Sequence, residues 1–531
     1  MKHINKHLLI IIMSVGILFS SCKKDFLNIN SNPNSPTDDN ITAELIFTSA
    51  AEGVGAANVG ARASGAGAKS SMQFAQNWVG YMASNGDFAR DNTETSYDID
   101  FNFGNTLFLT RYGVLFDLHQ AEVKGLATGD TAIAAAAMIL SAKMYQELVD
   151  LFGDLPYSQA FQTDKYTQPA YDKAEDIYKA LQQKLDQAIV YMGKTAPKSF
   201  ATADIINHGD LNKWIKFANT QKLRLLIRQS ESTGFSPTEE IAKITKDGDI
   251  NVLGAGESVS VNPGYANELN KQSPFYANYG LTATGTIANT SSNANDYIVS
   301  ILNASGDARL QAFFTPVGSS FVGNVYGDVP GNLITASRTS YFGPGTRICS
   351  DPKQDQWIMP SYESLFFKAE AIARGWVPGD GKAALDAAIT ESFHWLLDGT
   401  LAIADIDAAI TDYIANSTIA DYTIVEGSDP LEKARFVAFQ KYVANTCIDP
   451  LESYSDIRRL DFLKTKTKGL KDFFNLPALN GKNYISINEG KKAETLPVRL
   501  LYPQSEYTTN SENVLKEGTI DAFTSKLFWQ K

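Results

Sequence analysis

Two polar segments combine flat aromatic rings with amide and charged side chains, a mixture suited to holding a sugar. A sugar has apolar C–H faces that pack on rings, and hydroxyl edges that bond to amides, carboxylates and guanidinium groups. We expect ligand-binding residues in both segments, although each ring could instead pack inside the protein. The first segment offers Asn77, Trp78, Tyr81, Asn85, Asp87 and Arg90. The second offers Tyr265, Asn267, Phe275, Tyr276, Asn278 and Tyr279, and Asp296 and Tyr326 are further candidates.

Patterns for catalysis or cofactor binding are weak in this sequence. A phosphate-loop spacing fails because Ala68, and not glycine, precedes Lys69. A dinucleotide pattern that starts at Gly53 and Gly55 has Asn58 in the third glycine position. The sequence has no G-x-S-x-G or H-E-x-x-H motif and no EF-hand loop. We expect no enzyme activity and no cofactor, while structural calcium stays open and a hydrolase is a minor alternative.

The N-terminus reads as an export signal. Lys2 and Lys6 precede an apolar run over residues 8–19, which is too short to span a bilayer. Small residues stand immediately before Cys22, as in a bacterial lipobox, whose cysteine is acylated. We predict a signal peptide over residues 1–21, acylation of Cys22, and a polar tether over residues 22–40 that cannot fold alone. The alternative is an ordinary signal peptide with an incidental cysteine.

Charge and cysteine content narrow the possible partners. The chain has 47 Lys and Arg against 59 Asp and Glu, a formal net charge of −12. This acidic balance argues against a nucleic-acid partner, which requires a basic surface. Cys349 and Cys447 could pair in an oxidising compartment, or each could be buried and unpaired.

Hydrophobic periodicity predicts a mostly α-helical domain over residues 41–531. Apolar residues recur at helical spacing in residues 131–156, 171–189, 210–230, 361–376, 381–397 and 429–447. Asp172 and Glu175 have the spacing of a capping box for the second of these helices. We therefore expect a scaffold of paired helices over about 106–232 and 358–460. Residues 58–105 and 249–355 are rich in Gly, Asn, Ser, Thr and Tyr, which predicts irregular insertions with few short strands.

Four phrases in series resemble SusD/RagB-like proteins: LVDLFGDLPYSQAF (148–161), LNKWIKFANTQKLRLLIR (211–228), YESLFFKAEAIARGW (362–376) and RLLYPQSEYTTNSENV (499–514). The lipobox and the tether agree with this resemblance, which covers nearly the whole mature chain. One departure is Tyr454, close to where the family often has a tryptophan.

The resemblance implies a fold of tetratricopeptide-like helix pairs that support a variable ligand face. It also implies a lipid-anchored protein on the outside of the outer membrane. Such proteins capture an oligosaccharide, or in some members a peptide, and deliver it to a SusC-like TonB-dependent barrel without chemistry. A peptide-binding lid is the first alternative, and a helical-repeat scaffold without a nutrient ligand is the second.

Overall fold

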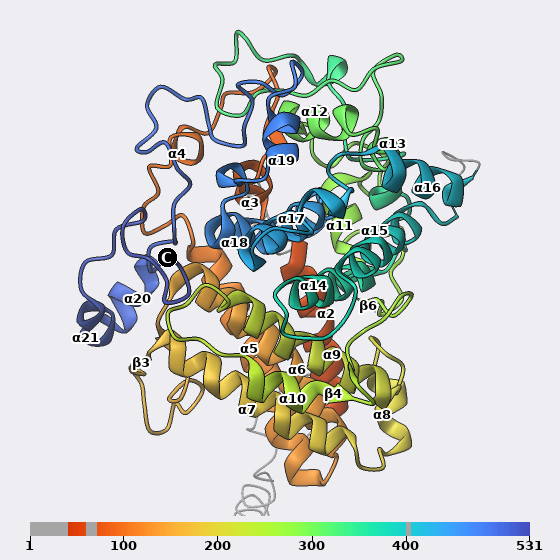
Figure 1. Ribbon diagram of the computed structural model, residues 1–531. Coiled ribbons are helices and arrows are strands. Elements are labelled where there is room, and N and C mark those ends of the chain that lie inside the picture. Colours follow the sequence, from red (N-terminus) through yellow and green to blue (C-terminus); the bar gives the residue numbers. More distant parts are fainter. Residues whose placement is uncertain (1–40, 60–71, 400–404) are drawn as a thin grey trace, which may run out of the picture. The chain divides into compact units, whose positions relative to one another are not determined.

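Long helices that pack on their neighbours along the chain form the scaffold of the computed structural model, which describes residues 41–59, 72–399 and 405–531 (Figure 1). Cys22, the predicted signal peptide and the rest of the tether up to residue 40 lie outside the described residues. Residues Ala43–Lys531 form one compact unit. The longer helices are α2 (Ala43–Val59), α5 (Asn105–Thr128), α6 (Thr131–Phe152), α7 (Ala174–Met192), α9 (Leu211–Arg228), α14 (Ser361–Ala373), α15 (Gly381–Leu397), α16 (Ile406–Asn416), α17 (Pro430–Ala444) and α18 (Pro450–Leu460).

Short helices and two- to four-residue strands make up the other regular structure, and about half of these elements lie in the two segments expected to be irregular. The short α-helices are α3 (Gln73–Trp78), α4 (Asn92–Thr95), α8 (Lys198–Ala203), α10 (Thr238–Ile244), α11 (Pro274–Tyr279), α12 (Asp296–Ala304), α13 (Leu310–Phe313), α19 (Lys468–Phe474), α20 (Gln504–Thr509) and α21 (Ser511–Val514). The 3-10 turns are η2 (Ala336–Arg338), η3 (Arg347–Cys349), η4 (Tyr422–Ile424), η5 (Phe462–Lys464) and η6 (Leu515–Glu517).

The strands form four antiparallel pairs and no larger sheet within the described residues. They are β1 (Met82–Ser84) with β7 (Ser292–Ala294), β2 (Leu155–Pro156) with β3 (Tyr171–Asp172), β4 (Thr245–Lys246) with β5 (Asp249–Ile250), and β6 (Val259–Val261) with β8 (Gln356–Met359). The first and last pairs join the two irregular segments to each other and to the helices. The structure therefore confirms a mostly α-helical fold with few short strands.

Helix α6 is the central core helix of the first group of helices. It packs against α5, α7 and α9, and it is fully buried, although its length and composition would also suit a membrane span. Asp130 caps its start by accepting hydrogen bonds from the N–H groups of Ala132 and Ile133, both at 3.1 Å. Gly153 ends it with a φ of 84°, a conformation that favours glycine. The helix predicted over residues 131–156 is thus confirmed, and the structure shows that it is buried.

The predicted capping box of α7 is wrong. The helix begins at Ala174, and Asp172 lies in β3, where its carboxylate accepts from the N–H groups of Tyr157 at 3.1 Å and Ser158 at 2.8 Å. Asp154 caps the helix from outside, since its carboxylate accepts from the Ala174 N–H at 2.8 Å. Asp154, which lies 20 residues before Ala174, therefore caps the helix in place of Asp172.

A buried network of charges joins the first helical group to the second. Glu452 on α18 accepts from Arg224 at 2.9 Å and Arg228 at 2.5 Å, both on α9, and from Lys441 on α17 at 2.7 Å. All four side chains are almost fully buried. The three cations hold the pKa of Glu452 well below its usual range despite burial.

The network continues from α18 to α14. Arg459 donates to both carboxylate oxygens of Glu370, at 2.6 and 2.8 Å, and to Asp456 at 2.8 Å. Arg458 donates instead to the carbonyls of Asp150 at 2.7 Å and Val498 at 2.8 Å. Both side chains of this arginine pair therefore anchor α18 to neighbouring elements.

Cys349 and Cys447 are both free and buried. Burial raises the pKa of each thiol above its ordinary value. The sequence left open whether these two cysteines form a disulfide, and in the structure they do not.

Glu363 on α14 gives a prediction for the pH dependence of stability. Neither of its carboxylate oxygens has a hydrogen-bond partner among the described residues. Burial, followed by the charge of Asp449, raises its pKa to about 8 from an ordinary value of 4.5. The folded protein therefore binds a proton that the unfolded chain releases, so this contribution to stability is complete below pH 4.5 and is lost as the pH rises through 8.

We expect Glu363→Gln to remove this contribution, which amounts to at most about 1.4 kcal/mol per pH unit between the two pKa values. The measurement is urea denaturation of the unaltered protein and of Glu363→Gln at several pH values. The difference between their unfolding free energies is used because the titration of all other groups cancels in it. A difference in unfolding free energy that stays constant between pH 4.5 and 8 would contradict the assignment.

Candidate ligand-binding cavity

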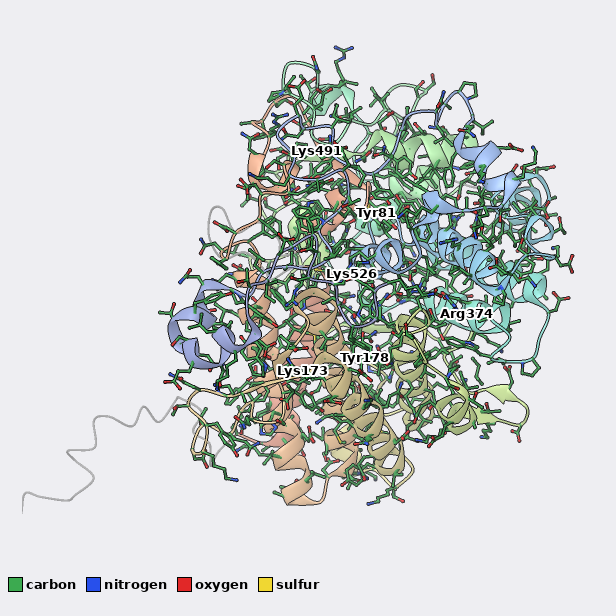
Figure 2. All side chains as sticks on the ribbon, turned by 60° about the vertical axis from the view of Figure 1, so that its left-hand side comes forward. Tyr81, Lys173, Tyr178, Arg374, Lys491 and Lys526 are labelled. Carbon is green, nitrogen blue, oxygen red and sulfur yellow. The ribbon has the colours of Figure 1, made fainter. Side chains whose placement is uncertain are left out.

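Most residues of the first predicted segment are structural. Trp78 is completely buried, and its indole ring is stacked on Phe103 at 5.5 Å and met by the edges of Phe74 and Tyr454. Tyr81 is also buried (Figure 2), and its hydroxyl bonds to the Tyr442 carbonyl and to Ser453. The predicted stacking role of these two rings is therefore corrected to a core role, because neither ring has an open face.

The buried amides of this segment hold loops together. Asn77 donates to Glu94 at 2.6 Å, and Asn85 donates to the Thr290 carbonyl and to Asn293, both at 2.7 Å. Their amide nitrogens therefore donate to protein partners. The predicted ligand contact of Asn77 and Asn85 is corrected to a structural role.

The second predicted segment is also mostly buried. Its rings lie in or next to the short helix α11, and Tyr265, Phe275, Tyr276 and Tyr279 are each at most 7% exposed. Asn278 is half-buried. The rings pack on protein, as Phe275 does against Trp357 at 4.8 Å between centroids. These four rings are therefore packing residues, and their predicted contact with ligand is corrected to a packing role.

The two predicted segments are nevertheless joined. Asn85 bonds to Thr290 and Asn293, while the Tyr341 hydroxyl donates to the carbonyls of Tyr279 at 2.8 Å and Asn289 at 2.7 Å. Residues 289–294 thus connect the first segment to the second.

Asp87 and Arg90 are the members of the first segment that reach the surface. Asp87 is exposed and accepts from the Ala336 N–H at 2.8 Å. Arg90 is half-buried, donates to the Gly327 carbonyl at 2.8 Å, and lines a cavity of about 590 Å³ with Val329 and Ile487. None of the described residues that line this cavity is aromatic, so it offers polar contacts but no ring for a sugar face.

A second cavity, which we call the tryptophan cavity, has the chemistry expected of a sugar site. It has a volume of about 680 Å³ and lies between the β6–β8 pair, η3 and the end of α15. Ser260 on β6 pairs with Trp357 on β8, so their side chains point to the same face. The residues that line it are Gly256, Ser258, Ser260, Arg347, Ile348, Ser350, Asp351, Gln354, Asp355, Trp357, Ser361, Glu391, His394, Trp395, Leu396 and Asp398.

Two indole rings form the flat part of this lining. Trp395 is half-buried, and it meets Trp357 edge-on at 6.0 Å and Tyr362 edge-on at 5.4 Å. Trp357 is held by Phe275 behind it and by a hydrogen bond from its Nε1–H to the Ile448 carbonyl at 3.2 Å. A fixed, partly open indole beside carboxylates, serines and a guanidinium matches the needs of a sugar ring.

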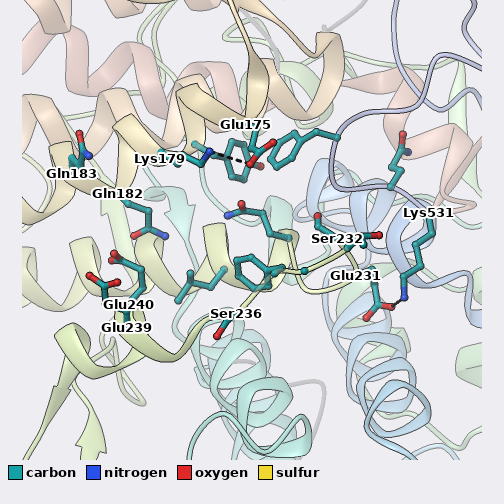
Figure 3. Close-up of a pocket in the computed structure, with 18 of the residues that line it drawn as sticks. Glu175, Lys179, Gln182, Gln183, Glu231, Ser232, Ser236, Glu239, Glu240 and Lys531 are labelled. Atoms are coloured by element: carbon teal, nitrogen blue, oxygen red, sulfur yellow. Dashed lines mark hydrogen bonds and ion pairs between the residues drawn. The ribbon is translucent and has the colours of Figure 1, made fainter.

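A third cavity, the α7–α10 cavity, has a volume of about 720 Å³ (Figure 3). Its carboxylates are neutralised by neighbours: Glu175 pairs with Lys179 at 3.0 Å and Glu231 with Lys531 at 2.8 Å. Lys243 pairs with Glu240 at 2.6 Å and lies 3.8 Å from Glu239. The cavity also has aromatic rings, but its charged groups already satisfy one another. Among the described residues no group of three or more His, Cys, Asp or Glu is arranged to hold a metal ion.

Comparison with known proteins identifies the family. The model of the SusD-like family, described as starch-binding and associating with the outer membrane, matches residues 38–479. The chain belongs to the SusD-like family. A comparison with curated sequences finds no significant match for this SusD-like chain.

Solved structures share the fold of this SusD-like chain. A SusD homologue from Bacteroides fragilis has a TM-score of 0.72 at 19% identity, covering 92% of this chain and 99% of its own. A chitin-binding SusD homologue from Flavobacterium johnsoniae has a TM-score of 0.68 at 19% identity, covering 91% and 98%. A SusD/RagB family protein from Bacteroides thetaiotaomicron has a TM-score of 0.68 at 18% identity, covering 92% and 99%.

Sequence reasoning missed Trp357, Glu391 and Trp395. The helical spacing of residues 381–397 predicts a core helix, and Trp395 in its last turn looks like another packing residue. The one available signal is that polar His394 and Asp398 flank this tryptophan, which places it near the edge of the apolar face.

Trp78→Ala tests the core role of this ring. Removing a fully buried tryptophan is expected to lower the free energy of unfolding by about 3–5 kcal/mol. Chemical denaturation measures the loss, with Trp395→Ala, a change at a half-buried ring, as the comparison. An unfolding free energy that Trp78→Ala leaves unchanged would contradict the core assignment.

Proposed function

We propose that this SusD-like chain binds an oligosaccharide in the tryptophan cavity, at the cell surface, and passes it unchanged to a SusC-like TonB-dependent transporter. The half-buried indole of Trp395 is the observation that carries the proposal, because it offers a ring face beside polar groups. The chitin-binding homologue with the same fold supports a glycan as the ligand class.

Capture by the tryptophan cavity needs no chemical step. Stacking on Trp395 supplies contact area, and Ser260, Gln354 and Arg347 supply hydrogen-bonding groups for hydroxyl edges. Because a lid must release its cargo, we expect an affinity that is micromolar or weaker, about 8 kcal/mol or less. The peptide-binding alternative would depend less on the indole ring and more on charged groups.

Asp87 and Arg90 remain candidate ligand residues of a separate surface. They are the exposed and half-exposed members of the first predicted segment, and Arg90 lines its own cavity.

We further propose that acylation of Cys22 holds the protein on the outer membrane, facing the exterior. The lipobox-like residues before Cys22 support this, and so does the polar tether that follows. Several acyl chains at about 0.8 kcal/mol per buried CH₂ anchor a protein without a transmembrane helix.

Trp395→Ala tests the proposed glycan site. We expect about 30-fold weaker binding, since a central aromatic contact is worth about 2 kcal/mol. Isothermal titration against a panel of neutral oligosaccharides and mixed peptides provides the measurement. Trp376→Ala is the matched control, because Trp376 is also half-buried but packs against Phe235, outside the tryptophan cavity. Equal affinity of Trp395→Ala and the unaltered chain for a bound glycan would refute this site.

Cys22→Ser tests the anchor. In a bacterium that acylates lipoproteins, the variant should leave the membrane fraction, because serine cannot carry the thioether-linked lipid. Cell fractionation followed by immunoblotting gives the result, and Cys349→Ser, a change at a buried thiol, is the control. Membrane association that persists in Cys22→Ser would count against lipidation at this residue.

A further inference from the structure

Three carboxylates of the tryptophan cavity have no cationic partner. Asp351, Asp355 and Glu391 form no ion pair with any residue that the structure describes. Among the described residues that line the cavity, Arg347 alone has a guanidinium group, which donates to the Asp398 carbonyl at 3.2 Å and to Ser350 at 3.5 Å. His394 is occupied by Asp398 at 3.0 Å and Asp407 at 3.4 Å. The lining therefore presents an excess of negative charge to whatever enters.

Glu391 is the most informative of these groups because it is only 8% exposed. One of its oxygens, Oε1, accepts from the Gly256 N–H at 2.8 Å and from the Ser361 hydroxyl. The other oxygen, Oε2, takes part in no hydrogen bond or ion pair within the described part of the chain. Since Glu391 lines the cavity, this oxygen is left for a ligand.

A buried carboxylate without a cation is unfavourable unless a partner compensates it. Several glutamates of this protein follow that rule. Glu452 has three cations, Glu370 has Arg459 and Arg374, and all four glutamates of the α7–α10 cavity lie within 4 Å of a lysine. Glu391 forms no ion pair and lines the tryptophan cavity. Glu363, which also forms no ion pair with a described residue, lines none of the three cavities and binds a proton instead, because burial raises its pKa to about 8.

We propose that the tryptophan cavity selects oligosaccharides of amino sugars whose amino group is free and protonated. This inference rests on the proposed glycan-binding function and names the substrate class of the same site. The ring of such a sugar packs on Trp395 while its ammonium group donates to Glu391 Oε2. A bare metal ion is a poorer occupant, since no three carboxylates of the described lining residues are arranged to coordinate one. Uronic acids are disfavoured by repulsion from Asp351, Asp355 and Glu391.

The test compares short oligomers of glucosamine, N-acetylglucosamine and galacturonic acid by isothermal titration of the purified full chain. The titration is done at a mildly acidic pH, below the pKa of the sugar amino groups, so that these groups are charged. We expect the glucosamine oligomer to bind about tenfold more tightly than its N-acetylated counterpart, and the galacturonic acid oligomer not to bind. The first two oligomers differ in the charge and acetylation of the nitrogen alone, so their ratio reports on the carboxylates.

Glu391→Gln should reduce the tenfold preference to about equal affinity. The glutamine keeps an oxygen that can accept from the Gly256 N–H and the Ser361 hydroxyl, so the local fold is retained. Glu239→Gln, at an exposed carboxylate of the α7–α10 cavity, is the matched control and should retain the preference.

The possible failures are distinguishable. If the unaltered chain binds the glucosamine and N-acetylglucosamine oligomers with equal affinity, the preference for a free amino group is overturned, but the proposed glycan site is not. Absence of binding by every glycan overturns both the preference and the proposed function. Binding of a lysine oligomer that depends on Glu391, without binding of the glucosamine oligomer, assigns the cavity to basic peptides and overturns the amino-sugar proposal.

Discussion

The contacts of Glu452 with Arg224, Arg228 and Lys441 fix how the two helical groups of this protein pack together. These residues come from α9, which is remote in sequence, and from the consecutive helices α17 and α18, and the carboxylate is buried with its three cations. Removing one partner of such a buried group leaves an uncompensated charge, which costs several kcal/mol. The arrangement of the scaffold therefore depends on the close approach of these three helices.

The position of the tryptophan cavity follows from this scaffold. Helix α14 packs against both α15 and α17, so the helix that carries Glu391 and Trp395 is positioned by the group that contains the charge network. The β6–β8 pair then brings Ser260 and Trp357 to the same face. Rigid helices and one short strand pair thus hold the rings and carboxylates that a ligand would meet, while irregular segments supply the remaining surface.

Burial separates two kinds of aromatic residue in this SusD-like chain. Trp78, Tyr81 and Phe275 stabilise the irregular segments from within, where helices and strands are too short to supply a core. Trp395 keeps part of its ring open. The abundance of rings in the loop segments therefore reflects the needs of folding as much as those of binding.

The sequence by itself determined the helical class, the bounds of most long helices to within a few residues, and the family. Helical periodicity, aspartate caps and breakers such as Gly153 act between neighbours along the chain, so a linear pattern records them. The anchor at Cys22 also remains a prediction of sequence alone. Only the tertiary structure decided which rings are open and which charges are paired. Trp78 is covered by Tyr454, and Asp154 takes the place of Asp172 as a helix cap. Glu391 forms no ion pair with a described residue, whereas Glu452 contacts three cations. The exposure of a ring and the pairing of a charge depend on neighbours that are distant in sequence, and these neighbours come together only when the chain folds.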